Sequence, residues 1–356
     1  MKLIAILINY YTGKFLSPLL DVLQKEALIE KIFVFDNSKE QEILEYSENY
    51  SKVKIIISEI NVGFAAGVNA ITSQHHADYY LLINPDTLPT KEFSKKLFEA
   101  AEKYKALVSG PRFYWDDDKS FRLSPAVGNS LIILNSLKIS QQSYSDAQIL
   151  TKNWAVQHDS FWNNEIPFSQ PFLSGACLLI KNDPLFFHDG KIFDDRFFLY
   201  YEDTDLCIRA MLENQPVICV PDAEVVHYWD QSPSDNKHLL MRESHKKFFD
   251  KHYPKYILND QYYKSFPDKV KLSVDYIGEF NDSPIFTYNK IDYCEDRYFF
   301  EIGLNPVFVP FAQCWVKETT YLISPKLWNM MKPGIYFSRI RTGTNQVIKI
   351  WKWKKL

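Results

Sequence analysis

The chain has 356 residues, 46% of them hydrophobic, and a formal net charge of -3 from 41 Lys and Arg against 44 Asp and Glu. At about 150 residues per domain, this length fits one large domain or two. The ordinary globular balance excludes wholesale disorder and a disulfide scaffold. The near-neutral charge argues against a protein that coats nucleic acid, so no nucleic-acid partner is expected.

The cysteines and the N-terminus favour a cytoplasmic protein. No two cysteines have C-x-x-C spacing, which argues against a zinc knuckle or a dithiol redox motif, and an odd count is typical of reduced, buried thiols. The apolar run at residues 1–9 is too short for a signal peptide, and no stretch of about 18 apolar residues could span a membrane. The five cysteines are Cys177, Cys207, Cys219, Cys294 and Cys314.

The first quarter of the chain alternates short apolar runs with helical patterns. Strands alternating with helices predict a mostly parallel sheet that is covered on both faces. Strands are expected at 3–8, 31–35, 53–57 and 79–83, and helices at 15–28, 65–73 and 91–104.

Polar residues follow three of these strands, at Asn9, Asp36 and residues 84–86. In open α/β sheets, ligands bind outside the carboxyl ends of the strands. The sequence therefore predicts a binding site at this edge of the sheet.

The middle of the chain is less regular. Residues 112–170 show no clear period, and the acidic run at 116–118 is interpreted as a solvated turn. After it we expect a strand at 172–180, interrupted by Ser174 and Gly175. A helix at 202–213, a strand at 217–220 and a helix at 237–252 follow.

The pattern changes after residue 262, where short runs of β-formers alternate with Pro, Gly, Asn and Asp. The runs at 335–341 and 346–353 flank Thr-Gly-Thr-Asn, a hairpin signal. We therefore expect two domains, an α/β domain over 1–262 and a small β-domain over 263–356, built as a sandwich. This β-domain could bind a glycan, mediate self-association or act as a lid.

Two motifs near the predicted sheet edge are compatible with a nucleotide site. Gly63 and Gly67 precede a helix start, where free N–H groups favour phosphate, although a plain turn is an equal alternative. The spacing matches neither the Rossmann nor the Walker pattern, which argues against NAD and ATP. In Asn84-Pro85-Asp86-Thr87, the acid could hold Mg²⁺ or Mn²⁺ together with a diphosphate, or it could simply cap a turn.

The densest cluster of acids lies at a helix start, at Glu202, Asp203 and Asp205. Acids there can cap the helix and complement its dipole. The aromatic stretch before them indicates a partly apolar pocket, in which a carboxylate could act as a general base, and we favour this function. His227 follows a strand-like run and could bind a metal or a phosphate, or be structural.

In this order, the motifs resemble those of the family 2 inverting glycosyltransferases, in particular the rhamnosyltransferase-like branch. The resemblance covers about residues 1–250 and implies the GT-A fold, a nucleotide-sugar donor and Mg²⁺ or Mn²⁺. It rests on residues 7–10, 34–38, 61–69, 82–87, 172–180 and 193–209, and on His227 with Ser232.

The resemblance also implies roles for individual residues. Asp203 would be the catalytic base with Glu202 beside it, and Asp86 and His227 would face the metal or the diphosphate. Asp36 would contact the uracil or thymine ring, while Ser174 and Gly175 would line the acceptor side. The nucleotide pocket would further involve Asn9, Asn37, Gly63, Gly67, Asn69 and Asn84.

The expected function is inverting transfer of a sugar from a UDP- or dTDP-sugar to a hydroxyl of a glycan or lipid-linked acceptor, in bacterial surface polysaccharide synthesis. Asn-Pro-Asp replaces the common Asp-x-Asp metal motif and leaves one fewer anionic ligand. The alternative is a carbohydrate-binding or scaffold protein that retains the transferase fold. A nucleotidyltransferase is disfavoured because no Gly-rich, basic loop follows the first strand.

The C-terminal segment Lys349–Leu356 is basic and aromatic. It could contact the inner face of an anionic membrane. It could equally be an edge strand whose lysines discourage pairing with another chain.

Overall fold

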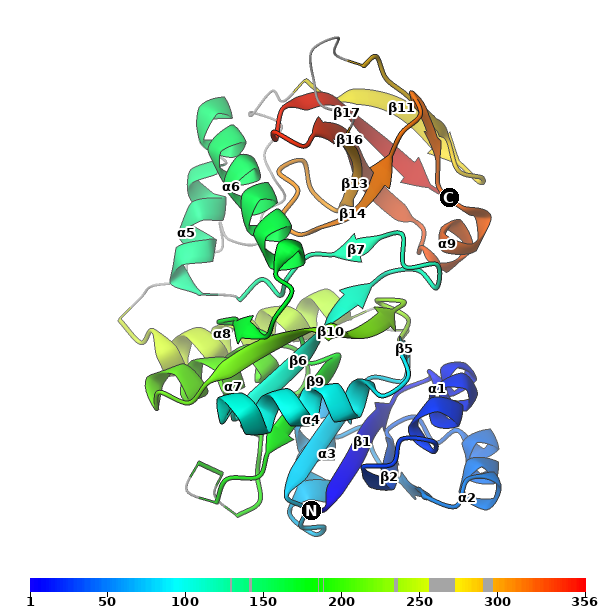
Figure 1. The fold of residues 1–356 in the computed structure, drawn as a ribbon, viewed down its shortest axis with the longest axis vertical. Coiled ribbons are helices and arrows are strands. Elements are labelled where there is room, and N and C mark those ends of the chain that lie inside the picture. The colour runs from blue at the N-terminus through cyan, green and yellow to red at the C-terminus, as the bar shows by residue number, and fades with distance from the viewer. Residues whose placement is uncertain are drawn as a thin grey trace. The chain divides into compact units, whose positions relative to one another are not determined.

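The computed structural model describes residues 1–128, 130–140, 143–184, 186–187, 189–233, 236–255, 273–290 and 297–356. The chain divides into two compact units. Unit 1 comprises Met1–Arg112 and Asn164–Leu258, and unit 2 comprises Phe113–Asn163 and Asn259–Leu356 (Figure 1). The predicted domain boundary after residue 262 lies outside the described residues, as does Cys294.

Unit 1 is built on a mostly parallel sheet, as the sequence predicts. Its strands are β1 (Leu3–Asn9), β2 (Ile29–Asp36), β3 (Val53–Ile57), β4 (Tyr79–Ile83), β5 (Thr87–Pro89), β6 (Val108–Tyr114), β8 (Phe168–Ser169), β9 (Cys177–Lys181) and β10 (Val217–His227). Its helices are η1 (Gly13–Phe15), α1 (Leu16–Leu23), η2 (Gln41–Glu45), α2 (Tyr46–Asn49), α3 (Phe64–Thr72), α4 (Phe93–Tyr104), α7 (Glu202–Leu212) and α8 (Lys237–His252).

The order of the central strands is β6-β9-β4-β1-β2-β3. Strands β3, β2, β1 and β4 are parallel to one another, and β9 is antiparallel to β4. All five residues of β4 are buried, which is typical of a strand covered on both faces. The register pairs Asn9 with Asp36 at the carboxyl ends of β1 and β2.

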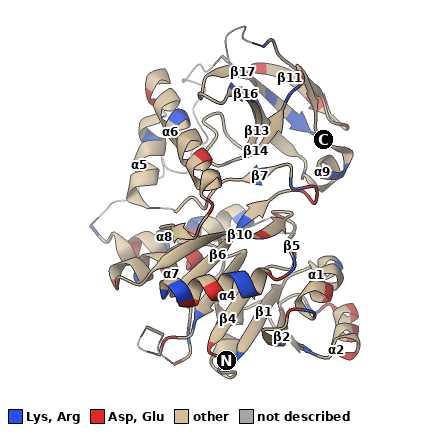
Figure 2. Ribbon diagram, in the orientation of Figure 1, with Lys and Arg blue, Asp and Glu red and all other residues tan. Residues whose placement is uncertain are grey.

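Helix α4 shows how the sequence pattern selects a helix in this unit. Leu97, Ala100 and Ala101 are buried on one side, and the exposed side carries lysines and glutamates (Figure 2). Apolar residues at this spacing form one stripe of a helix. The predicted helix at 91–104 is therefore confirmed, with its start at Phe93.

The strands of unit 2 have the order β11-β17-β16-β13-β14-β7, and β12 and β15 form a separate pair. The strands are β7 (Arg122–Leu123), β11 (Asp275–Phe280), β12 (Ile285–Thr287), β13 (Tyr298–Gly303), β14 (Phe311–Val316), β15 (Thr320–Leu322), β16 (Gly334–Thr342) and β17 (Val347–Lys355). The helices are α5 (Leu131–Ser140), α6 (Tyr144–Asn163) and α9 (Pro325–Met330).

The expectation that residues 112–170 are irregular is wrong, because α5 and α6 occupy much of this segment. Trp154 of α6 packs in one core cluster with Phe308 and Phe311. The opposite face of the same sheet packs against β12 and α9, through Phe286 and Leu327. Unit 2 is thus one sheet between a helix pair and a short ribbon, where the sequence predicts a sandwich.

Strand β17 shows that the edge-strand interpretation of the C-terminal segment is wrong, whereas the membrane contact stays a prediction. It lies between β16 and β11, so it is not an edge strand. Trp351 and Trp353 are buried in the core, so their aromatic rings are not available for a membrane contact. Lys349 and Lys354 instead form ion pairs with Asp275 and Glu279 of β11.

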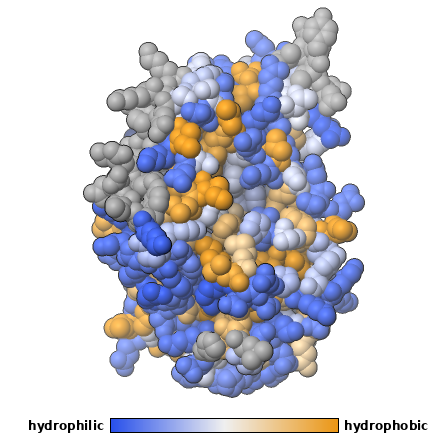
Figure 3. Space-filling view, turned by 90° about the vertical axis from the view of Figure 1, so that its left-hand side faces the viewer, coloured by the Kyte–Doolittle hydropathy of each residue, from blue (hydrophilic) through white to orange (hydrophobic). Residues whose placement is uncertain are grey.

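The helices of the described residues include none with the length and hydropathy of a membrane span. Several apolar side chains are nevertheless exposed on α5 and α6, among them Ile132, Ile139, Ile149 and Val156. Figure 3, which faces the side of Figure 1 where these helices lie, shows hydrophobic side chains separated by hydrophilic ones.

Candidate active site

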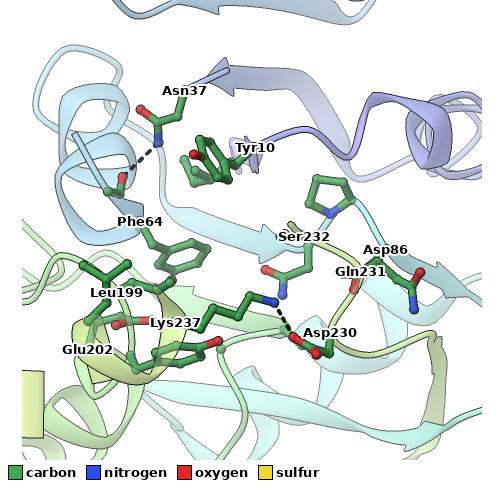
Figure 4. Close-up of a pocket in the computed structure, with 18 of the residues that line it drawn as sticks. Tyr10, Asn37, Phe64, Asp86, Leu199, Glu202, Asp230, Gln231, Ser232 and Lys237 are labelled. Atoms are coloured by element: carbon green, nitrogen blue, oxygen red, sulfur yellow. Dashed lines mark hydrogen bonds and ion pairs between the residues drawn. The ribbon is translucent and has the colours of Figure 1, made fainter. Parts of the chain in front are cut away.

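A pocket of about 320 Å³ lies within unit 1. It brings together residues from the ends of several strands and from the start of α7 (Figure 4). The predicted site residues that line it are Asn37, Gly63, Asn84, Asp86, Ser174, Gly175, Glu202, Asp203 and His227. Acids that are more than 100 residues apart in the chain therefore share one cavity.

Asp86 and His227 are neighbours because of how two strands pair. After β4, the turn Asn84–Asp86 leads into β5, which runs antiparallel to the end of β10, with Thr87 opposite His227. His227 Nε2 lies 3.6 Å from Asp86 Oδ1. Burial lowers the pKa of His227, and the Asp86 carboxylate opposes this effect, so the imidazole is neutral at neutral pH and keeps a lone pair.

Asp203 is held in a fixed orientation at the start of α7. The Gly175 N–H donates to its Oδ2 at 2.9 Å, and the Thr204 N–H donates to its Oδ1 at 2.6 Å. A Cβ atom at Gly175 would lie 3.3 Å from Asp203 Cβ, which explains why a glycine suits this close approach. Burial raises the pKa of Asp203, and these hydrogen bonds oppose the rise.

Glu202 precedes Asp203 and has different surroundings. Its side chain is buried in the pocket wall, and its Oε2 has no hydrogen-bond partner among the described residues. Burial, together with the charge of Asp203, raises the pKa of Glu202 to about 8.

The backbone is strained on both sides of the pocket. Tyr200 and Tyr201, just before α7, have φ of 69° and 73°, and Trp229 and Asp230, just after β10, have φ of 53° and 58°. Non-glycine residues in this region cost about 1–3 kcal/mol each and cluster at functional sites. Tyr200, Trp229 and Asp230 all line the pocket.

Lys237, at the start of α8, has the one lysine or arginine side chain among the described residues that line the pocket. It forms an ion pair with Asp230, visible in Figure 4. The other charged lining residues are the acids Asp86, Glu202, Asp203 and Asp230. An anionic ligand would therefore need a cation to offset them.

Two predicted residues lie behind the pocket and are not part of its lining. Asp36 is fully buried, and its carboxylate accepts hydrogen bonds from the Asn9 side chain, the Ser38 N–H and the Glu40 N–H. Asn9 in turn accepts from Thr12 through its Oδ1. Both residues fix the loop after β2, so a contact of Asp36 with a base stays a prediction.

Gly67 and Asn69 of α3 also lie outside the lining. A Cβ atom at Gly67 would lie 3.1 Å from Ile8 Cδ1, so this glycine allows α3 to pack on the sheet. The Asn69 side chain accepts from the Ile192 and Phe193 N–H groups and donates to Phe193 O. The role predicted for these two residues in the nucleotide pocket stays a prediction.

Sequence reasoning missed several lining residues. Tyr10 directly follows β1 and lay within a matched motif, which could have identified it. Lys237 follows His227 by ten residues without any local motif, so only the fold reveals it. The other missed residues are Ile8, Asn61, Phe64, Pro85, Ala176, Phe198–Tyr200, Trp229–Gln231, Pro233 and Leu240. Ser232, which carries the resemblance together with His227, also lines the pocket.

The donor set at Asp86 and His227 fits a divalent cation that shares its shell with a substrate. No group of three or more His, Cys, Asp or Glu side chains in the described part of the chain is arranged to hold a metal ion. Mg²⁺ and similar cations are, however, often held by one or two carboxylates plus phosphates and water. The carboxylate and the neutral imidazole supply two of the required donors.

Comparison with known proteins identifies relatives of this chain. The model of the family described as glycosyl transferase family 2 matches residues 5–169. The N-acetylglucosaminyl-diphospho-decaprenol L-rhamnosyltransferase of Mycobacterium tuberculosis is 25% identical over 216 residues, which is 57% of this chain and 67% of the relative. Rhamnosyltransferase WbbL of Escherichia coli is 22% identical over 240 residues, 63% of this chain and 82% of the relative.

The crystal structure of GalNAc-T7 with UDP, GalNAc and Mn²⁺ matches with a TM-score of 0.50 at 12% identity. The match covers 74% of this chain and half of that chain. It bears on the fold alone and agrees with the α/β sheet described above. The fold is GT-A, and the chain is similar to glycosyl transferase family 2 over residues 5–169 and to the two rhamnosyltransferases over more than half of its length.

Proposed function

We propose that the protein transfers a sugar, with inversion, from a UDP- or dTDP-sugar to a hydroxyl of a lipid-linked or glycan acceptor in bacterial surface polysaccharide synthesis. The observation that carries the proposal is the convergence of Asp86 and Asp203 on one pocket. The names of the two rhamnosyltransferase relatives support a deoxyhexose as the sugar. The name of the Mycobacterium tuberculosis relative also supports a polyprenyl-linked acceptor.

In this reaction Asp203 is the general base. The acceptor oxygen bonds to the anomeric carbon while the bond from that carbon to the diphosphate oxygen breaks. The acceptor proton moves to the Asp203 carboxylate, and the electron pair of the broken bond leaves with the nucleoside diphosphate. The Gly175 and Thr204 N–H groups orient the carboxylate for this transfer.

The negative charge of the leaving diphosphate would be stabilised by groups on another side of the pocket from Asp203. Asp86 and His227 would hold Mg²⁺ or Mn²⁺, which supplies electrostatic stabilisation of the diphosphate when bound. Lys237 lines the same cavity and adds a positive charge when it exchanges its Asp230 partner for a phosphate oxygen. Asn9, Asp36, Gly67 and Asn69 contribute by fixing the nucleotide-facing loops.

The test combines a donor panel with an Asp203→Asn variant. The wild-type protein is incubated with UDP- and dTDP-sugars and a lipid-linked acceptor, and products are identified by mass spectrometry. Asp203→Asn should reduce transfer by about 10²–10⁴-fold, the usual contribution of a general base, with nucleotide affinity nearly unchanged by calorimetry. Near-normal turnover in this variant would reject the assignment of the base.

A further inference from the structure

Glu202 and Asp203 are consecutive carboxyl groups in very different environments. Both oxygens of Asp203 accept hydrogen bonds from backbone N–H groups. Glu202 is 7% exposed, and its Oε2 is buried with no partner in the described part of the chain. Both side chains line the same pocket.

An ionised Glu202 would be unfavourable at this position. A buried carboxylate needs donors or an opposite charge, and without them it becomes protonated. The charge of Asp203 next to it adds to the effect of burial, in agreement with the raised pKa of about 8. A protonated carboxyl group differs from a carboxylate because it carries an O–H donor.

The charged and titratable groups around Glu202 are mostly acidic or neutral. Asp203 and Asp205 lie on the same helix, and Tyr200 lies on the loop before it. Lys237 of α8 is in the same pocket but is paired with Asp230. The remaining titratable residues of the pocket lining are Tyr10, Asp86 and His227.

We propose that Glu202 works as a neutral acid, which donates a hydrogen bond to a sugar hydroxyl beside the reacting one and so positions the sugar for Asp203. The inference rests on the proposed function. Neighbouring residues of a helix point about 100° apart, so the two carboxyl groups can address different oxygens of one sugar. The bound hydroxyl supplies the partner that Glu202 lacks in the described structure.

Two substitutions at Glu202 separate this role from that of a base. Glu202→Gln keeps an N–H donor of nearly the same shape and cannot accept a proton, whereas Glu202→Ala has no donor. We expect Glu202→Gln to retain a kcat/KM about 10-fold higher than that of Glu202→Ala, the approximate effect of one buried hydrogen bond. Equal loss in both variants, or inactivity of Glu202→Gln to the level of Asp203→Asn, would overturn the proposal.

Thermal stability against pH provides a readout that does not depend on activity. The pKa of Glu202 is higher in the folded state (about 8) than its ordinary value of 4.5. The folded state therefore keeps the proton to a higher pH than the unfolded state, and the wild-type protein loses stability as pH rises between these two values. The Glu202→Gln variant does not lose stability in this way, because its amide does not titrate. The difference in Tm between Glu202→Gln and the wild type should therefore increase from pH 5 to pH 8 and then level off.

A Tm difference that is constant over this pH range would contradict a neutral Glu202. The proposed function and the neutral-acid role of Glu202 can fail independently of each other. If no donor yields product with the wild-type protein, the proposed function fails, while the pH profile still reports the protonation state of Glu202. If transfer is observed and the profile is flat, only the neutral-acid role fails.

Discussion

At the scale of single residues, the proposed metal site would depend on Asp86, because Asn84 replaces the first acid of the common motif. We expect Asp86→Ala to remove the increase in UDP or dTDP affinity that Mn²⁺ provides, since the neutral His227 alone is a weak ligand for a cation that prefers oxygen donors. Calorimetry with and without Mn²⁺ measures this effect.

Asp230→Asn is the matched control for Asp86→Ala, because Asp230 lines the same pocket and also carries a carboxylate. It should keep the Mn²⁺-dependent increase in affinity. If Asp86→Ala retains the same increase as Asp230→Asn, Asp86 is not a metal ligand.

The residues of the site were predictable to the extent that they lie in short motifs at the ends of elements. Asp86 and Asp203 were identified in this way and share a pocket. Asp36 also follows a strand, but its carboxylate is already occupied by neighbouring donors. Sequence position shows that a residue is near the sheet edge, whereas its direction depends on hydrogen bonds that no pattern encodes.

At the scale of elements, the start of α3 depends on Gly63. Its φ is +87°, and a Cβ atom there would lie 2.3 Å from the Phe198 carbonyl oxygen. The next N–H, of Phe64, donates to that same oxygen at 2.8 Å. This contact joins the α3 segment to the loop that leads into α7.

Gly63→Ala should therefore destabilise the fold and weaken nucleotide binding. A backbone with φ of 87° and ψ of -178° is essentially restricted to glycine and costs an alanine about 1–3 kcal/mol, and the overlap with Phe198 adds to this. Gly278→Ala is the matched control, because Gly278 has φ of +119° and only the Phe280 ring nearby, at 3.5 Å. Thermal melts and UDP calorimetry should show a larger loss in Gly63→Ala; equal effects in both variants would contradict the role of the Phe198 contact.

The longest elements that the sequence failed to predict are α5 and α6. Residues 131–134 are all apolar and give no single stripe, and Ile132 is 77% exposed in the structure. A helix is recognised from sequence by an apolar face alternating with a polar one. The predicted helix over 237–252 is confirmed, because α8 has the same bounds.

At the scale of the whole molecule, residues 113–163 and the C-terminal strands belong to one unit, although they are far apart in the sequence. This has a consequence for the sheet of unit 2. Glu301 of β13 alternates with the apolar Phe300 and Ile302, a pattern that normally places a charged residue in water. Because α6 covers that face, Glu301 is fully buried instead.

The burial of Glu301 is compensated by two arginines from β16. Its two carboxylate oxygens accept from Arg339 Nε and Arg341 Nε, and both arginines are buried. Arg341 also donates to Asp159 of α6 at 2.6 Å. The two Nη atoms of Arg339 have no hydrogen-bond partner among the described residues. Removing the charge of Glu301 would therefore also take away the carboxylate that pairs with the buried Arg339 guanidinium.

Glu301→Gln should therefore destabilise unit 2 by about 3–5 kcal/mol, the usual cost of breaking a buried ion pair on one side. Tryptophan fluorescence reports on this unit, because Trp229 is the one tryptophan of the eight that lies in unit 1. Lys354→Gln is the control, since it removes an exposed pair with Glu279 that is worth at most about 1 kcal/mol. If Glu301→Gln unfolds at the same urea concentration as Lys354→Gln, the buried network does not hold α6 and the sheet of unit 2 together.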